Sequence, residues 1–311
     1  MQSDLIWKAA LALTGLGMLF GTLLAVAFRF FRVELDPRVE EVLGALPGSN
    51  CGACGLPGCE AAAEAIVSGE APPDTCKAGG PDTTREVGRI LGVEVEAGVR
   101  RVAHIRCRGG ESLSPRMAFY QGVNTCRGAE LASGGGKACP YGCLGLKDCA
   151  DACPVNAINF GEEGVREVIV SKCTGCGICV EVCPRGLIEL VPAEQKVLVR
   201  CNSHYTGKRA VALCKVACTG CRRCEKVCPR DAIHVREGVA HIDFDRCDDC
   251  GECAATCPTD SIQVWTPLPG HPHEGEFAVP PKARPEKSPS SSKEGGVGGP
   301  GKGEDAPGGE S

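Results

Sequence analysis

Aromatic residues are scarce in this sequence. The 311 residues include only 8 Phe, 3 Tyr and 2 Trp, together with 42 Gly and 22 Pro. Aromatic side chains supply a large share of the buried area in ordinary cores, so this composition argues against one large conventional core. Something other than hydrophobic burial must therefore stabilise much of the chain.

Several familiar catalytic and cofactor motifs are absent. The six histidines form no HExxH sequence and no CxxCH occurs, so nothing supports a zinc peptidase or a c-type haem protein. No GxGxxG lies in a strand-turn-helix context, and we therefore expect no nicotinamide or flavin bound to this chain. The formal net charge of −5 argues against nucleic acid as the main partner.

Cysteine, in contrast, is abundant. There are 24 cysteines, and most follow one another after two or three intervening residues. A disulfide framework is typical of short secreted chains, whereas this chain is long and its spacings are tight. The cysteines are therefore predicted to bind metal.

The N-terminal residues 1–33 differ from the rest. The segment from Ala9 to Phe28 contains no charged residue and as a helix would span about 30 Å of hydrocarbon. A cleaved signal peptide would have a shorter apolar region with basic residues before it. Basic residues follow the span at Arg29, Arg32 and Arg38 while only Lys8 precedes it, so we expect a single-pass anchor with the following domains in the cytoplasm.

An internal repeat dominates the second half of the chain. Cys-Pro followed by three residues and Ile occurs at Cys153, Cys183, Cys228 and Cys257. The last three copies end a full Cys-x2-Cys-x2-Cys-x3-Cys-Pro run, and the first ends a stretched run that begins at Cys139. This run is typical of [4Fe–4S] proteins, in which three cysteines bind one cluster and the fourth binds the other cluster of a pair. Zinc ribbons use two separated pairs instead.

The exchange of the fourth cysteine predicts four ligand sets. They are Cys139, Cys143, Cys149 with Cys183; Cys173, Cys176, Cys179 with Cys153; Cys218, Cys221, Cys224 with Cys257; and Cys247, Cys250, Cys253 with Cys228. Short apolar alternations between the runs predict three hairpins, pairing 158–160 with 168–170, 188–190 with 197–199, and 233–235 with 241–244.

A separate cysteine group precedes the repeat. Asp36-Pro37 predicts a helix start, and Pro47-Gly48 its end. Cys51, Cys54, Cys59 and Cys76 follow, with further helical stretches at 60–67 and 84–91. Spacing alone leaves this site open between zinc and [4Fe–4S].

The motifs together resemble a known family. The anchor, the segment Leu46-Pro-Gly-Ser-Asn-Cys51-Gly-Ala-Cys54-Gly-Leu-Pro-Gly-Cys59, the later Cys76 and the run from Cys139 to Cys153 closely resemble the B subunit of the Rnf complex. That family is the ion-translocating ferredoxin:NAD oxidoreductase of bacterial membranes, and the second pair at 218–257 resembles its longer, polyferredoxin-type members. The resemblance implies a [4Fe–4S] cluster at Cys51–Cys76. It also implies integral membrane partners and a flavin- and NAD-binding partner subunit.

These observations predict an α+β protein with seven segments. They are an anchor (1–33), a small helical [4Fe–4S] domain (34–100), a connecting segment (101–136), a first ferredoxin-like domain (137–200), an insertion (201–217), a second ferredoxin-like domain (218–265) and a disordered tail (266–311). The tail consists mainly of Pro, Gly, Ser, Lys and Glu, and cannot bury enough apolar surface to offset its ordering entropy.

Four cysteines remain after five clusters are assigned. Cys107 and Cys126 precede the first ferredoxin-like domain, while Cys201 and Cys214 follow it. Folding could bring these four together as a sixth cluster site. The alternative is that they are buried or incidental thiols.

The predicted function is electron transfer between soluble ferredoxin and partner subunits of a bacterial cell-membrane complex that translocates ions. One alternative is a membrane-anchored polyferredoxin that donates electrons to another reductase or to a redox-sensor-reducing system; another is a zinc-bound scaffold. Acidic ferredoxins are expected to dock on basic residues beside a cluster. The candidates are Lys215, Arg222, Arg223, Lys226 and Arg230, although these residues could merely offset cluster charge.

Overall fold

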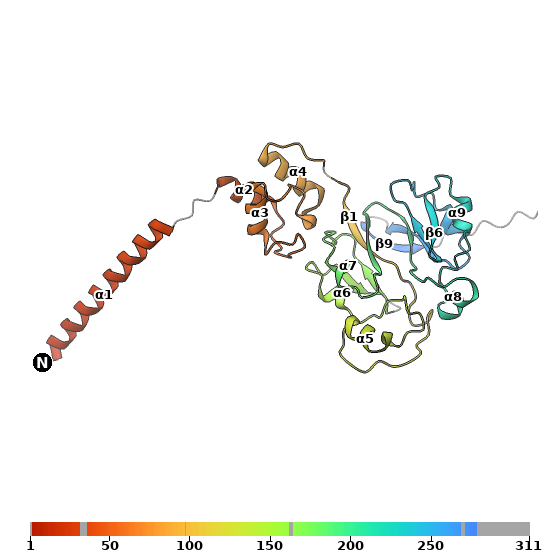
Figure 1. Ribbon diagram of the computed structural model, residues 1–311, viewed down its shortest axis with the longest axis horizontal. Coiled ribbons are helices and arrows are strands. Elements are labelled where there is room, and N and C mark those ends of the chain that lie inside the picture. Colours follow the sequence, from red (N-terminus) through yellow and green to blue (C-terminus); the bar gives the residue numbers. More distant parts are fainter. Residues whose placement is uncertain (1, 32–35, 97, 162–163, 269–270, 279–311) are drawn as a thin grey trace, which may run out of the picture.

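The computed structural model describes residues 2–31, 36–96, 98–161, 164–268 and 271–278. The first element is helix α1 (Gln2–Phe31), which stands apart from the other elements (Figure 1). Its stretch from Ile6 to Phe31 is long and apolar enough to cross a membrane, and none of its most apolar window is buried. The hydroxyl of Thr14 donates to the carbonyl of Ala10 and that of Thr22 to Met18, both at 2.8 Å, so these polar groups are satisfied within the helix.

A small helical domain follows. It contains α2 (Pro37–Ala45), α3 (Cys59–Ser68), a 3₁₀ turn η1 (Lys77–Gly79) and α4 (Gly80–Leu91). The Asp36 carboxylate accepts from the N–H of Arg38 at 2.9 Å, which confirms the predicted helix start. Val42, Ile66 and Val87, one from each α-helix, are buried together and form the core of this domain.

Two further units contain the cysteine runs. What we call the first unit consists of β1 (Arg101–Ile105), α6 (Asp148–Asp151), β2 (Ile158–Phe160), β3 (Arg166–Val168), α7 (Ile178–Val182) and β4 (Ile188–Pro192). The second unit consists of β5 (Val197–Val199), α8 (Gly207–Leu213), α9 (Arg223–Val227), β6 (Ile233–Arg236), β7 (Val239–Ile242), α10 (Glu252–Thr256) and β8 (Ile262–Leu268). Each unit has its own buried apolar core.

The strand pairings confirm two of the three predicted hairpins. β2 pairs with β3, with Ile158 opposite Val168, and β6 pairs with β7, with Ile233 opposite Ile242. The predicted pairing of 188–190 with 197–199 is wrong. β4 instead pairs with β1, and β5 pairs with β8, so adjacent strands in sequence join different units.

The side chain of Asp249 binds the start of β5 and accounts for its pairing with β8 and not with β4. One carboxylate oxygen accepts from the N–H of Val197 at 2.8 Å and from that of Lys196 at 3.1 Å. These hydrogen bonds tie the start of β5 to the loop before α10. The strand therefore pairs within the second unit, while its Leu198 is buried in the core of the first unit.

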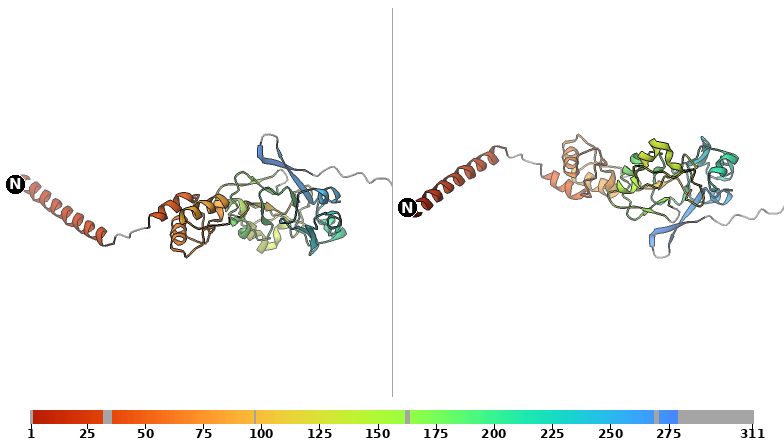
Figure 2. Two further views of the ribbon diagram at one scale, coloured as in Figure 1. Left: turned by 90° about the horizontal axis from the view of Figure 1, so that it is seen from above. Right: turned by 90° about the horizontal axis from the view of Figure 1, so that it is seen from below.

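The connecting segment 101–136 and the predicted tail also contain regular structure. Beyond β1, the segment includes α5 (Cys126–Ser133), continued by a 3₁₀ turn η2 (Gly134–Gly136). In the tail, β8 runs to Leu268 and pairs with β9 (His271–Ala278), placing Trp265 opposite Phe277. This hairpin projects from the rest of the protein in both views of Figure 2. The expectation of disorder is therefore wrong for residues 266–268 and 271–278, and residues 279–311 lie outside the described residues.

Candidate metal centres

None of the 24 cysteines forms a disulfide. Among the residues that the structure describes, no group of three or more His, Cys, Asp or Glu side chains converges closely enough for a single metal ion. The cysteines nevertheless gather in groups of four.

The helical domain gathers the first four. Burial raises the pKa of Cys76, and repulsion from Cys59, Cys51 and Cys54 raises it further, because the four thiols lie close together. The loop needs glycine at Gly52, Gly55 and Gly58, where φ is positive. The side-chain oxygen of Asn50 accepts from the N–H of Cys59 at 2.8 Å and fixes the end of the loop at the start of α3.

The four Cys-Pro units share one local geometry. In three of them the sulfur accepts a backbone N–H from four residues further on: Ala157 donates to Cys153 at 3.2 Å, Leu187 to Cys183 at 3.4 Å and Ala232 to Cys228 at 3.3 Å. In the fourth unit the residue at that position is Ser261, whose hydroxyl lies 3.3 Å from Cys257 Sγ. Such donors stabilise a thiolate and influence the potential of a cluster that it binds.

Three of the predicted sets in the two units are brought together. Burial raises the pKa of Cys179 to about 12, with repulsion from Cys173, Cys176 and Cys153 adding to it. Burial likewise raises the pKa of Cys253 to about 12, with repulsion from Cys247, from Cys224 of the adjoining set, and from Cys250 and Cys228. One pocket is lined by all four members of a third set, Cys218, Cys221, Cys224 and Cys257.

The remaining predicted set is only partly assembled. Cys143, Cys149 and Cys183 line one pocket as expected, but the fourth cysteine in that pocket is Cys126. Burial raises the pKa of Cys149 to about 12, and repulsion from Cys143, Cys126 and Cys183 adds to the increase. Cys139, the predicted fourth member, does not line this pocket.

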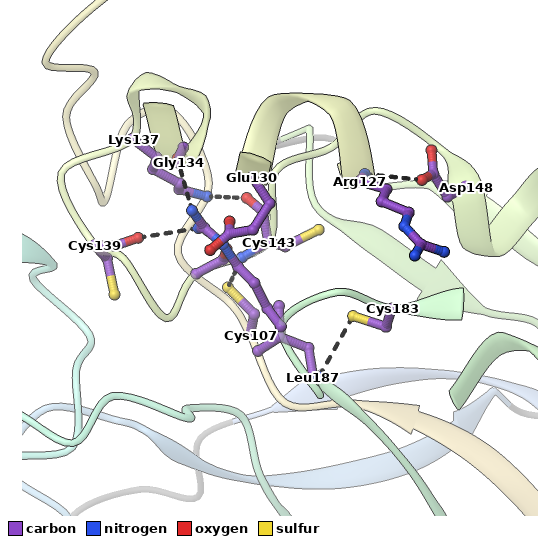
Figure 3. A network of polar contacts seen from close by, with 12 residues as sticks. Cys107, Arg127, Glu130, Gly134, Lys137, Cys139, Cys143, Asp148, Cys183 and Leu187 are labelled. Carbon is purple, nitrogen blue, oxygen red and sulfur yellow. Dashed lines mark hydrogen bonds and ion pairs between the residues drawn. The ribbon is translucent and has the colours of Figure 1, made fainter. Parts of the chain in front are cut away.

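Cys139 lines a second pocket. The other cysteines there are Cys107, Cys201 and Cys214, three of the four left unassigned by the repeat. All four are buried. Figure 3 shows the sulfurs of Cys139 and Cys143 on opposite sides of the loop that joins them. The structure thus places Cys126 and Cys139 in each other's predicted positions.

A buried arginine, Arg185, holds the loop that joins Cys139 to Cys143. Arg185 donates to the carbonyl oxygens of Gly134 and Gly142, both at 2.6 Å, and to that of Cys139 at 3.3 Å. Its Nε also lies 2.6 Å from the carboxylate of Glu130 in α5. Sequence reasoning missed Arg185, and its position directly after Cys183-Pro184 carries no signal of these contacts.

The side chain of Asp148 brings Cys126 to its pocket. One carboxylate oxygen accepts from the N–H of Cys126 at 2.8 Å and the other from that of Arg127 at 3.1 Å. The hydroxyl of Thr125 caps the same end of α5 by accepting from Gly128. Because Asp148 directly precedes Cys149, these bonds place the two cysteines in one pocket.

The surroundings of both pockets fit an anionic cluster. The Nε atoms of Arg106 and Arg166 are buried with no hydrogen-bond partner among the described residues, and each arginine lines one of the two pockets. Buried donors are normally satisfied, so these atoms indicate a missing acceptor. The raised thiol pKa values also mean that metal binding must displace protons from the free thiols.

The five candidate docking residues all lie on the surface, and Cys221 beside them is exposed. Two of them lie near acidic groups: Arg230 is 3.1 Å from Asp248 and Arg222 is 4.0 Å from Glu225. Acidic side chains therefore offset part of the basic charge.

Comparison with known proteins shows which cofactor such sites bind. A family model described as "Putative Fe-S cluster" matches residues 46–78, and the 4Fe-4S dicluster domain matches residues 138–187, 172–232 and 217–261. These matches confirm the prediction of 4Fe-4S domains, while the number of clusters stays a prediction.

Three relatives align over most of the chain. The B subunit of the Na⁺-translocating ferredoxin:NAD⁺ oxidoreductase complex of Acetobacterium woodii is 49% identical, covering 74% of this chain and 69% of its own length. The B subunit of the ion-translocating oxidoreductase complex of Methanosarcina acetivorans is 40% identical, covering 79% and 93%. The B subunit of the proton-translocating ferredoxin:NAD⁺ oxidoreductase complex of Clostridium ljungdahlii is 39% identical, covering 76% and 83%.

Proposed function

The chain belongs to the family of B subunits of ion-translocating oxidoreductase complexes, the Rnf family, and from this premise we propose its role. It is the iron–sulfur electron-transfer subunit of a membrane complex that couples electron transfer between ferredoxin and NAD to ion translocation. Integral membrane subunits and a flavin- and NAD-binding subunit complete the complex.

One observation carries this proposal: the cysteines of a single chain gather repeatedly into groups of four beside donors that suit thiolate ligands. A bound [4Fe–4S] cluster supplies one-electron chemistry. The chain's own residues hold the clusters, exclude water from them and set their potentials through N–H and O–H donors.

We propose four ligand sets, which the cysteine spacing and the neighbouring thiols support. They are Cys51, Cys54, Cys59 with Cys76; Cys173, Cys176, Cys179 with Cys153; Cys218, Cys221, Cys224 with Cys257; and Cys247, Cys250, Cys253 with Cys228. The last two sets make the second unit a two-cluster, ferredoxin-like domain.

The order of the sites along the chain suggests an electron route. The helical domain lies beside the first unit, and the second unit lies on the far side of the first (Figure 1). Cys76 and Cys176 line one pocket between the helical domain and the first unit, which brings their two sites close together. Electrons from ferredoxin would enter at the second unit and pass through the first unit to the helical domain next to the membrane anchor.

We place ferredoxin docking beside the Cys218–Cys257 site. The exposed residues Lys215, Arg222, Arg223, Lys226 and Arg230 give this surface a basic character. Opposite charge raises the encounter rate of an acidic partner more than its final affinity. The exposed Cys221 brings this cluster close to the surface.

The anchor would place the cluster domains in the cytoplasm. Basic residues after the uncharged span 9–28 of α1 outnumber those before it, which favours a cytoplasmic C-terminal side. The exposed apolar side chains of α1, for example Leu11 and Leu24, would face lipid or a partner helix.

Anaerobic purification of the complex from membranes tests this function. We expect a brown protein that co-purifies with integral membrane subunits and a flavoprotein, contains iron and acid-labile sulfide, and is reduced by ferredoxin. A colourless zinc protein would refute the iron–sulfur role. A brown protein that purifies without these partners would indicate an anchored electron donor to a different acceptor.

A further inference from the structure

The pocket between the two units has no counterpart in a simple ferredoxin pair. Its four cysteines come from four separate segments: Cys107 follows β1, Cys139 begins the stretched first run, Cys201 follows β5 and Cys214 directly follows α8. We propose that Cys107, Cys139, Cys201 and Cys214 hold a sixth [4Fe–4S] cluster, and that Cys126 instead of Cys139 completes the cluster of Cys143, Cys149 and Cys183. This inference rests on the proposed iron–sulfur function.

The short loop between Cys139 and Cys143 explains the division. The N–H of Gly142 donates to the carbonyl of Cys139 at 3.1 Å, which closes a tight turn. Arg185 holds the carbonyls on both sides of that turn. The sulfurs of Cys139 and Cys143 point apart from this turn (Figure 3) and line different pockets, so the two cysteines would serve different clusters.

Backbone N–H groups donate to sulfurs of the pocket lined by Cys107, Cys139, Cys201 and Cys214, which we call the junction pocket. Cys107 Sγ accepts from the N–H of Cys143 at 3.3 Å, and Cys201 Sγ accepts from Cys218 at 3.2 Å and from Ser203 at 3.4 Å. Donors of this kind are typical of thiolates that ligate metal. Through its bond to Cys218, the junction pocket also directly adjoins a proposed ligand of the second unit.

Gly109 lies directly beside two of the pocket's sulfurs, where a side chain would not fit. A Cβ atom on Gly109 would lie 2.9 Å from Cys214 Sγ and 3.9 Å from Cys107 Sγ. The φ angle of Gly109 is not in the left-handed region, so its backbone conformation suits any residue. A larger side chain at this position would instead clash with the cysteine sulfur. The absence of a side chain at Gly109 therefore leaves room beside the sulfurs of Cys214 and Cys107.

The charged residues that line this pocket are all basic, although Arg106 lies 3.7 Å from Glu189 and Arg200 lies 3.8 Å from Glu167 outside it. Arg106, Arg108, Lys137 and Arg200 line it, and no carboxylate does among the described residues. Four basic residues favour an anionic thiolate-ligated cluster and should make its potential more positive than that of a cluster in an acidic loop. A junction cluster of this kind would connect the clusters of the two units.

Iron analysis and EPR of single variants in the full-length, anaerobically purified protein test the assignment. The unsubstituted protein should contain about 24 irons, six clusters of four. Cys139→Ser and Cys201→Ser should each remove the same EPR signal, while Cys126→Ser and Cys183→Ser should remove a different one. If Cys139→Ser and Cys183→Ser affect one shared signal, the division proposed here is wrong.

Gly109→Ala supplies a test that leaves every cysteine in place. It should remove the signal that Cys201→Ser removes and lower the iron content by about four, one cluster. Gly44→Ala is the matched control, because a Cβ there meets nothing within 4 Å. A fully loaded protein with about 20 irons, unaffected by Gly109→Ala, would overturn the sixth site and leave the proposed function intact, whereas a protein without iron would overturn both.

Discussion

The hydroxyl of Ser261 provides a direct measure of how this protein sets a cluster potential. Ser261 occupies the position that is Ala157, Leu187 or Ala232 in the other Cys-Pro units, and its Oγ lies 3.3 Å from Cys257 Sγ. Ser261 is almost completely buried. When Cys257 ligates a cluster as a thiolate, the hydroxyl must be the donor in this contact.

Ser261→Ala should make the potential of the Cys218–Cys257 cluster more negative. The added electron increases the charge on sulfur, so the hydroxyl stabilises the reduced form more than the oxidised form. A net hydrogen bond contributes about 1 kcal/mol. For a one-electron couple, in which 59 mV corresponds to about 1.4 kcal/mol, the full effect corresponds to about 40 mV.

EPR-monitored redox titration measures this shift. Ala232→Ser is the reciprocal variant, because Ala232 holds the equivalent position beside Cys228; it should make the potential of the neighbouring cluster more positive by a similar amount. An unchanged potential in Ser261→Ala, with the cluster intact, would refute the reasoning that this hydroxyl acts on the cluster.

Three further predictions concern other parts of the protein. Replacing Arg222 and Arg223 together by Glu should slow reduction by ferredoxin several-fold and flatten its salt dependence in stopped-flow measurements, because steering acts on the encounter rate. Arg185→Met should destabilise the protein by about 1–3 kcal/mol, since it leaves the carbonyls of Gly134, Cys139 and Gly142 without their donor, and iron analysis should show loss from both adjoining sites. Burial lowers the pKa of His104 to about 3, so between pH 6.5 and pH 3 the unfolded state binds a proton that the folded state does not. Urea unfolding should therefore show a loss of about 2 kcal/mol in the free energy of unfolding between pH 7 and pH 5, and a smaller loss in His104→Gln.

Each of these predictions has a control. Arg85→Glu with Arg89→Glu makes the same charge change on α4, away from the docking surface, and should leave the ferredoxin rate unchanged. Equal slowing by both double variants would remove the docking proposal. Arg185→Met with a full complement of iron would show that the loop does not need its arginine. A pH dependence identical in wild type and His104→Gln would mean that other groups dominate between pH 7 and 5.

Local patterns predicted the elements that depend on neighbouring residues. The capped start of α2 and the two hairpins β2–β3 and β6–β7 follow from short-range signals such as Asp36-Pro37 and apolar alternation. The pairings of β1 with β4 and of β5 with β8 join segments far apart in the chain, and alternation does not specify a partner. The hairpin of β8 and β9 was missed because its composition resembles that of the polar tail beyond it.

The cysteines show the same division between local and distant information. Counting them in fours predicts six sites, and the regular spacing predicts the full runs, because each loop must surround one cluster. Spacing does not predict which pocket Cys139 lines. Its sulfur points away from that of Cys143, at a loop held by Arg185. Nor does spacing predict that Asp148 brings Cys126 to Cys149 through the start of α5. Each of these proposed assignments depends on one side chain, Arg185 or Asp148, that binds backbone groups of a distant segment. If they hold, the stretched spacing of the first run reflects two clusters that share one loop and not a distorted copy of the repeat.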